Sequence, residues 1–249
     1  AERLAPFVED IDPDLRLTLS APQGQGPALP NDPLFALQYG MHAPGGLMQG
    51  EGLQWHDTYT NADINAPQAW SLRNDAQSIR IAVIDSGLYD HVDFYDVDPV
   101  TGGKLATSSN LWVNQQELTG TANQDDDGNG YIDDVRGWNY IPDATYASNN
   151  PFTGEIHGTK VAGIIGARGN SGRGISGVAW KCQIVPLRAF TDAGIGTSSF
   201  AITALEYCRR KGFELVNCSW HTPAVAPDSV SVLRAELVSM QATTQAAPR

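Results

Sequence analysis

The sequence predicts an α/β fold built on a largely parallel central sheet. Three observations point to it: short β-branched runs that end in turn residues, helical patterns that follow these runs, and the alternation of the two along the chain. In such a pattern each helix returns the chain, so that the next strand runs in the same direction. The ends of the strands and the starts of the following helices are then expected along one edge of the sheet.

The first expected elements lie in the middle of the chain. Asn65 is a candidate helix cap, and Pro67 falls in the first helical turn, where a missing N–H does no harm. The run at 79–87 is rich in Ile and ends in Ser-Gly, which predicts a buried strand. A second unit begins at His157, where the small residues that follow predict a helix packed closely on the sheet.

The remaining expected elements are, in order, a strand at 183–189, a helix from Ser198 or Ser199 to Gly212, a strand at 213–219 and a helix at 228–240. Pro186 removes one backbone donor from the first of these strands. The helix that ends at Gly212 carries Arg209, Arg210 and Lys211 in its last turn, where the helix dipole favours cations.

The domain organisation follows from a change in composition. Eight of the fifteen prolines lie within the first seventy residues, and no helical or alternating periodicity persists there. Residues 1–60 are therefore expected to form an extended segment. A compact domain is expected over 61–240, followed by a tail at 241–249.

The charge and composition exclude several classes of protein. The net charge is −12, which argues against a nucleic-acid partner, because such proteins need a basic face to neutralise phosphates. No apolar run approaches the roughly 20 residues that span a bilayer, so an integral membrane protein is not expected. The three cysteines, Cys182, Cys208 and Cys218, are too few for a disulfide framework or a zinc site.

Two residues stand where chemistry is expected in such a fold. Asp85 ends the strand predicted at 79–87, at the sheet edge where open α/β sheets bind their ligands. His157 opens a predicted helix. Each has a structural explanation when taken alone, since an Asp at a strand end often caps a turn and a His at a helix start is usually structural. Together they favour a catalytic pair.

These two segments resemble a known family. The sequence IAVIDSGLYDHVDF at 81–94, followed by HGTKVAG at 157–163, resembles the Asp and His blocks of the subtilisin family of serine endopeptidases. Segments at 64–70, 174–190 and 215–220 resemble other core segments of the family. The resemblance covers the chain from about Asn31 to about Met240.

The resemblance implies a three-layer subtilisin-like fold and the hydrolysis of peptide bonds in polypeptide substrates. Asp85 would orient His157, which would act as general base and then as general acid. Two strand edges would pair with an extended substrate, and they comprise Gly194, Ile195, Gly196, Ser219 and Trp220. His221 stands where the family often has Gly, so the primary specificity is left open. The resemblance also implies an extracellular or secreted protein, and residues 1–30 are a candidate pro-segment remnant.

The nucleophile block of the family has no good counterpart in this sequence. The segment Gly196-Thr197-Ser198 follows the His too closely, and Phe200 stands where a small residue is expected. We therefore expect a subtilisin-like fold truncated after the strand that ends near Ser219, an inactive isolated chain, and a downstream segment that supplies the nucleophilic Ser and the oxyanion Asn. Two alternatives stay open: a catalytically silent calcium-binding or interaction domain, and a truncated gene product.

An acidic segment at 123–134 predicts a structural calcium site. Oxygen ligands at the first, third, fifth, seventh and ninth positions of a calcium loop fall on Asp125, Asp127, Asn129, the carbonyl of Tyr131, and Asp133. Gly130 occupies the position that requires Gly, whereas Arg136 stands where a helix-loop-helix site has its bidentate Glu. The alternative is a solvated acidic turn. The family resemblance adds Asp93 and Asn170 as weaker candidates for a second calcium site.

Overall fold

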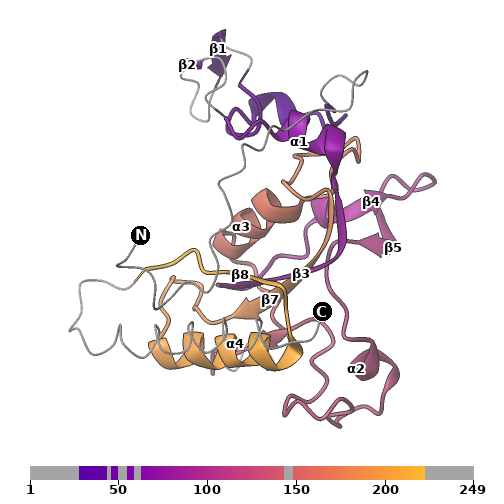
Figure 1. Ribbon diagram of the computed structural model, residues 1–249. Helices are drawn as coiled ribbons and strands as arrows, with labels where there is room; N and C mark the ends of the chain where they lie inside the picture. Colours follow the sequence, from indigo (N-terminus) through magenta and orange to yellow (C-terminus); the bar gives the residue numbers. More distant parts are fainter. Residues whose placement is uncertain (1–27, 44–45, 50–54, 59–62, 143–147, 222–249) are drawn as a thin grey trace, which may run out of the picture.

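The structure, a computed structural model, describes residues 28–43, 46–49, 55–58, 63–142 and 148–221 (Figure 1). Most of the segment expected at 1–60 lies outside these residues, as do the helix expected at 228–240 and the tail at 241–249.

A four-stranded parallel sheet forms the centre of the described fold. Its strands lie side by side in the order β6 (Trp138–Asn139), β7 (Lys181–Arg188), β3 (Asp75–Asp85) and β8 (Leu215–Asn217). All three pairs of neighbouring strands are parallel, and Ala82 in β3 lies opposite Val185 on one side and Val216 on the other. The predicted α/β class with a largely parallel sheet is therefore confirmed.

The other described elements lie outside this sheet. The helices are α1 (Ala66–Leu72), α2 (Gln115–Thr119), α3 (His157–Gly166), α4 (Ser198–Lys211) and two short 3₁₀ turns, η1 (Phe35–Leu37) and η2 (Val92–Phe94). Two antiparallel pairs complete the fold, namely β1 (Gly46–Gln49) with β2 (Trp55–Thr58), and β4 (Tyr95–Val97) with β5 (Lys104–Ser109). None of the described helices has the length and hydrophobicity needed to cross a bilayer.

The caps of two helices differ from the sequence prediction. The cap of α4 is Thr197, whose hydroxyl accepts a hydrogen bond from the Phe200 N–H, rather than Ser198 or Ser199. Asn65 does precede α1, but it adopts a left-handed backbone conformation (φ 54°) and its side chain caps nothing. The Asp63 carboxylate accepts a hydrogen bond from the Asn65 N–H at 2.7 Å.

The two faces of the sheet carry different helices, which makes three layers (Figure 1). Because side chains alternate along a strand, neighbouring residues of β3 face opposite layers. One face packs against α4 and includes Ala82, Ile84, Val185, Leu187, Ala204 and Leu205. The other packs against α3 and includes Ile81, Val83, Cys182, Ile184 and Ala162. The layered arrangement fixes where α3 begins relative to the end of β3.

Small residues let α3 approach the sheet closely, as the sequence predicted. A Cβ on Gly166 would stand 2.4 Å from Cys182 Sγ, and a Cβ on Gly158 would stand 2.2 Å from the carbonyl oxygen of Gly87. Both distances are far below van der Waals contact, so only Gly permits this packing. The first turn of α3 therefore rests directly on the turn that follows β3.

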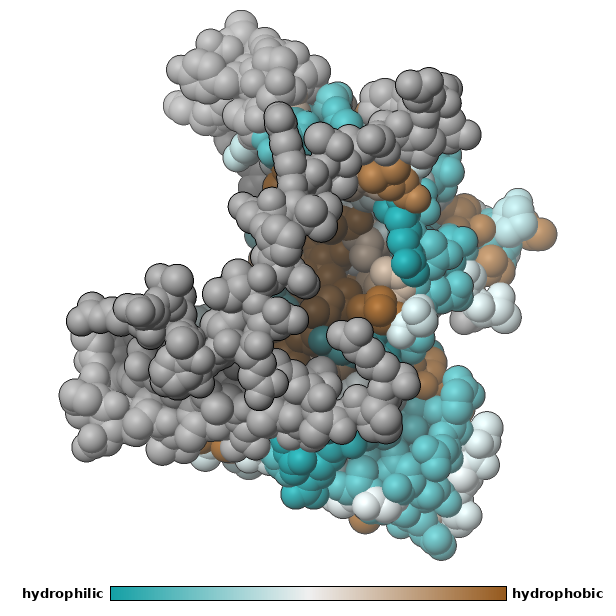
Figure 2. All heavy atoms as spheres, viewed as in Figure 1, coloured by the Kyte–Doolittle hydropathy of each residue, from teal (hydrophilic) through white to brown (hydrophobic). Residues whose placement is uncertain are grey.

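An apolar groove of about 500 Å³ remains between α3, β3 and β8. It is lined mainly by aliphatic side chains, including Ile79, Ile81, Ile164, Val178 and Leu215. Figure 2 shows hydrophobic residues in the hollowed centre of this view. Ile164 and Leu215 are both more than half exposed, so the layer on the α3 side is less completely covered than the layer on the α4 side.

Candidate active site

Asp85 and His157 meet at the edge of the sheet. The carboxylate oxygen Oδ1 of Asp85 lies 2.7 Å from Nδ1 of His157, which confirms the proximity expected from the sequence. The two groups differ in environment, since the Asp85 side chain is 4% exposed and the His157 side chain 60% exposed. Oδ2 of Asp85 is buried and has no hydrogen-bond partner among the described residues. A buried carboxylate thus holds an accessible imidazole.

A cavity of about 420 Å³ adjoins this pair. Three segments line it: the end of β3 with the start of α3, the loop after β7, and the residues after β8. Its lining residues are Asp85, Ser86, Glu155, His157, Phe190, Asp192, Ala193, Gly194, Ser219, Trp220 and His221. Three of the predicted substrate-binding residues, Gly194, Ser219 and Trp220, are therefore brought beside the Asp85–His157 pair.

The other two predicted substrate-binding residues lie just outside the cavity lining. Ile195 is 68% exposed, and its carbonyl oxygen accepts a hydrogen bond from the Thr191 N–H at 2.9 Å. Gly196 forms an isolated antiparallel bridge with Phe190. This segment folds back on the residues after β7 as a turn, so part of its backbone hydrogen-bonding capacity is already used.

Trp220 is anchored to the central sheet. Its indole N–H donates to the carbonyl oxygen of Ile84 at 3.0 Å, and its ring lies 5.7 Å from that of Phe190. An indole N–H that is partly removed from water needs a partner, and here a residue of β3 supplies it. The wall of the cavity formed by Trp220 is therefore held to the same strand that carries Asp85.

The acidic loop gathers carboxylates from two elements. One oxygen from each of Glu117, Asp125 and Asp127 lies within 4.8 Å of the others, and such a group could hold a metal ion. Glu117 belongs to α2 and is buried, and sequence reasoning missed it. Its two oxygens accept from the N–H groups of Asp126, Asp127 and Asp133, so it forms the centre around which the loop folds.

The remaining predicted ligands of the loop have other contacts. Oδ1 of Asn129 accepts from the Tyr131 N–H at 2.7 Å, and its amide donates to Asp134. The Asp133 carboxylate accepts from the Asn123 N–H at 2.9 Å and is not a member of the three-carboxylate group. Among the predicted ligands that have a carboxylate, Asp125 and Asp127 belong to this group and Asp133 does not.

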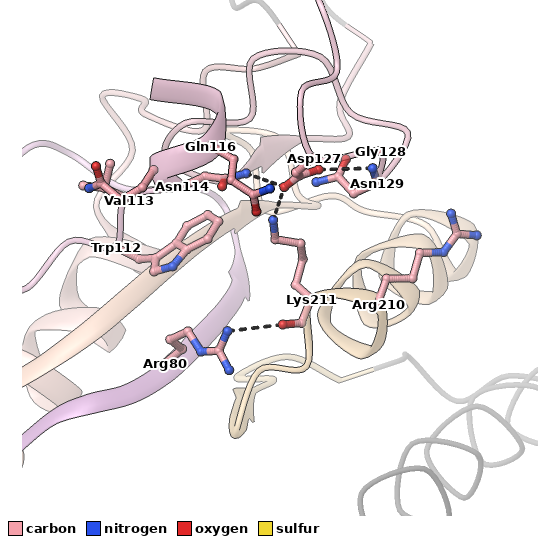
Figure 3. A pocket seen from close by; sticks show the side chains of 11 residues that line it. Arg80, Trp112, Val113, Asn114, Gln116, Asp127, Gly128, Asn129, Arg210 and Lys211 are labelled. Atoms are coloured by element: carbon pink, nitrogen blue, oxygen red, sulfur yellow. Dashed lines mark hydrogen bonds and ion pairs between the residues drawn. The ribbon is translucent and has the colours of Figure 1, made fainter. Parts of the chain in front are cut away.

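A cation from α4 reaches into the loop. Figure 3 shows Lys211 extending from the end of α4 to Asp127, which also accepts from the Asn114 amide at 2.8 Å. Burial alone would raise the pKa of Asp127, but the hydrogen bonds from Lys211 and Asn114 outweigh it and leave this pKa below its ordinary value. The ammonium also lies over the Trp112 ring, 5.4 Å from its centroid. A cavity of about 640 Å³ adjoins these residues.

Asp93 and Asn170, the weaker candidates for a second calcium site, have separate partners. Asp93 accepts from the Ile175 N–H at 3.3 Å, whereas Asn170 accepts from the Asn31 N–H at 3.2 Å. Within the described ranges, no group of three metal-ligating carboxylates, imidazoles or thiols includes Asp93.

Comparison with known proteins identifies the family of this chain. The model of the subtilase family matches residues 76–247, which is more than half of the chain. The chain belongs to the subtilase family. The resemblance read from the two sequence blocks is thereby confirmed.

Several curated subtilases are similar to this chain. Subtilisin-like protease 1 of Plasmodium falciparum (isolate 3D7) is 33% identical over 171 residues, which cover 68% of this chain and 22% of that protein. Subtilisin-like protease 1 of Plasmodium berghei is 31% identical over 174 residues, covering 67% of this chain and 26% of that protein. Thermitase of Thermoactinomyces vulgaris is 25% identical over 161 residues, which cover 65% of this chain and 43% of that protein. The chain therefore spans about a quarter of the length of the Plasmodium relatives.

Sequence reasoning about this subtilase missed two further acidic residues in the cavity beside Asp85 and His157. Glu155 precedes His157 by two residues, and Asp192 lies in the loop after β7. Asp192 accepts a hydrogen bond from the buried guanidinium of Arg188 at 3.0 Å. The sequence signal that could have found them is position alone, since Glu155 is close to His157 and Asp192 is close to Gly194.

Proposed function

We propose that this chain carries the base and orienting carboxylate of a subtilase serine endopeptidase. The observation that supports the proposal is the 2.7 Å contact between Asp85 and Nδ1 of His157, at the sheet edge and beside a cavity. A Ser hydroxyl is a weak nucleophile until a neighbouring imidazole takes its proton. With Nδ1 held by Asp85, the other ring nitrogen of His157 is left for that proton.

The proposed reaction uses the pair twice. His157 accepts the proton of the attacking hydroxyl and later donates it to the leaving amine, while Asp85 holds the ring and stabilises its cationic form. The substrate is an extended polypeptide that lies along Gly194 to Gly196 and along Ser219 and Trp220. Backbone hydrogen bonds would hold it, with the cavity receiving side chains.

The nucleophile is proposed to come from a segment outside these 249 residues. Ser198 is the first residue of α4 and does not line the cavity with His157. Ser219 does line the cavity, but its hydroxyl accepts from the Asn217 amide and its surroundings do not match the family block. The isolated chain is therefore expected to be inactive, since loss of the nucleophile costs a subtilase roughly 10⁶-fold in turnover.

The test compares the chain alone with the chain extended by its own downstream reading frame. Cleavage of an unfolded protein and labelling by a serine-directed phosphonate are measured for both. The extended chain should be active and labelled, and His157→Ala should abolish both properties. Labelling of the chain alone that disappears in Ser198→Ala would make Ser198 the nucleophile and overturn the proposal.

We also propose that the acidic loop binds calcium. Carboxylate oxygens are the ligands that calcium prefers, and the grouping of Glu117, Asp125 and Asp127 supports the proposal. Asn129, the Tyr131 carbonyl and Asp133 are the further proposed ligands, each within ten residues of Asp125. A bound ion would neutralise carboxylates that otherwise repel one another. An extracellular location fits this proposal, because calcium is abundant outside cells.

The second candidate function is a catalytically silent calcium-binding or interaction domain. The acidic loop favours it, because this loop is built independently of the Asp85–His157 pair. Calcium binding together with inactivity of the extended chain would support this candidate. A truncated gene product without a role of its own predicts instead that the purified chain fails to fold.

A further inference from the structure

The start of α3 is capped from outside the helix. The first N–H groups of a helix have no partner within it and usually bind a Ser, Thr, Asp or Asn side chain just before the helix. In α3 that place belongs to Ile156, which makes no side-chain cap. Instead, Oε2 of Glu155 accepts from the His157 N–H at 2.5 Å, and Oγ of Ser86 accepts from the Gly158 N–H at 3.1 Å.

Ser86 joins this cap to the end of β3. Its hydroxyl lies 2.6 Å from Oε2 of Glu155 and 3.2 Å from Oδ1 of Asp85. A hydroxyl has one proton to donate, so the shorter contact is the hydrogen bond. The Ser86 backbone N–H donates to Asp85 at 2.7 Å. Together with the contact between Asp85 and His157, these hydrogen bonds form a closed ring of four residues. The four are Asp85, Ser86, Glu155 and His157.

Glu155 brings a negative charge to this ring. Burial alone would raise the pKa of Glu155, but the hydrogen bonds from the Ser86 hydroxyl and the His157 N–H outweigh it and leave this pKa below its ordinary value. Glu155 is therefore ionised at neutral pH. Hydrogen bonds to a charged acceptor are stronger than neutral ones, so this is the stronger of the two caps.

Because the His157 side chain is exposed, its orientation must come from hydrogen bonds rather than from packing. The side chain is 60% exposed, so packing does not hold the imidazole in one rotamer. Its orientation depends on the Asp85 contact and on the placement of the first residue of α3. We propose that Glu155 is a positioning residue, which fixes the start of α3 against the end of β3 and thereby presents the His157 ring to Asp85. The catalytic consequence rests on the proposed function, whereas the positioning itself does not.

The test measures the hydrogen bond itself, in the 249-residue chain and without any activity assay. The chain is labelled with ¹⁵N-His, and the exchange with water of the ring proton between His157 and Asp85 is followed by NMR. The chain has five His residues, so His157→Gln assigns the signal. Asp85→Asn is the reference that should remove the protection of this proton.

Three variants separate the positioning role from a general loss of structure. In Glu155→Ala the proton should exchange about tenfold faster or more, as expected when a charged hydrogen bond is lost. Glu155→Gln keeps an acceptor oxygen and should restore most of the protection. The matched control is Glu206→Ala on α4, where Glu206 accepts three side-chain hydrogen bonds from Arg209 and Arg210, and it should exchange as the unmodified chain does.

An unchanged exchange rate in Glu155→Ala would overturn the proposal. Equal loss of protection in Glu155→Gln or in Glu206→Ala would overturn it as well. If Glu155→Ala does not fold, Ser86→Ala is measured instead, because it removes the hydrogen bond that links the end of β3 to Glu155. An unchanged exchange rate in Ser86→Ala would also overturn the proposal. A signal that is absent from the unmodified chain, or kept in Asp85→Asn, would instead contradict the Asp85–His157 pair and the proposed function.

Discussion

The junction of β3 with α3 and the acidic loop use carboxylates in two different ways. At the junction, Asp85 and Glu155 accept hydrogen bonds from groups at the end of β3 and the start of α3. In the loop, Asp125 accepts from the N–H groups of the loop itself, and one cation, Lys211, reaches in from α4. The junction carboxylates therefore orient an imidazole, whereas in the loop a carboxylate contacts a cation from another element.

The largest expected effect comes from separating β3 from α3. Gly158→Ala would place a Cβ 2.2 Å from the Gly87 carbonyl oxygen and 3.1 Å from Asp85. Because this contact is with backbone, the variant should lose about 3 kcal/mol in free energy of unfolding. Urea denaturation followed by tryptophan fluorescence measures the loss.

Gly163→Ala in the same helix is the control for this variant. A Cβ at Gly163 would meet only Ile175, at 3.6 Å, which is ordinary contact. Ala is the better helix former, so stability should stay the same or rise by up to about 1 kcal/mol. Equal losses in the two variants would show that the close approach at Gly158 has no special importance.

In the loop, Lys211→Met should have an effect of similar size. It leaves the nearly buried Asp127 without its cation, which should cost about 3 kcal/mol in the presence of a chelator. The cost should be smaller in excess calcium, because the ion replaces the lost charge. Lys104→Met, which breaks the exposed pair with Asp90, should cost less than about 1 kcal/mol under both conditions. If Lys211→Met costs the same with and without calcium, this would contradict the expectation that the calcium ion and the Lys211 ammonium both neutralise Asp127.

Calcium itself should stabilise the folded chain. Binding to the folded state alone adds about 2.7 kcal/mol at a concentration one hundred times the Kd. The melting temperature should therefore rise from chelator to excess calcium, as measured by calorimetry. Asp125→Asn should reduce this rise, whereas Asp98→Asn, in the turn between β4 and β5, should keep it. If the melting temperature is the same with and without calcium, the loop is a solvated acidic turn and not a calcium site.

The smallest effect is expected at a partly exposed ion pair. Hydrogen bonds from Arg209 and Arg210 lower the pKa of Glu206 from 4.5 to about 2. A depressed pKa means that this pair stabilises the fold above about pH 4.5 and that the contribution disappears as pH falls toward 2. Glu206→Gln should lose less than about 1 kcal/mol at pH 6, because the pair is partly exposed. Denaturation at pH 6 and near pH 2 tests this, and a loss that persists at the lower pH would contradict it.

Much of the fold was predictable because the relevant signals are local. The β-branched run at 79–87 and the small residues after His157 gave β3 and α3, and the cations before Gly212 marked the end of α4. The helix caps were predicted less well. Ser is the better cap than Thr by residue type, and yet the backbone geometry places the Thr197 hydroxyl, not that of Ser198, at the Phe200 N–H.

The sequence by itself determined the α/β class, the family, and the meeting of Asp85 with His157, since strand ends and helix starts share one sheet edge. The tertiary structure alone decided which further charged side chains enter the acidic loop and the surroundings of the Asp85–His157 pair. Glu117 reaches the acidic loop from α2, Lys211 reaches it from α4, and Glu155 closes on Ser86. The physical reason is that strand and helix patterns are set by neighbouring residues, whereas contacts between side chains of separate elements depend on how those elements pack.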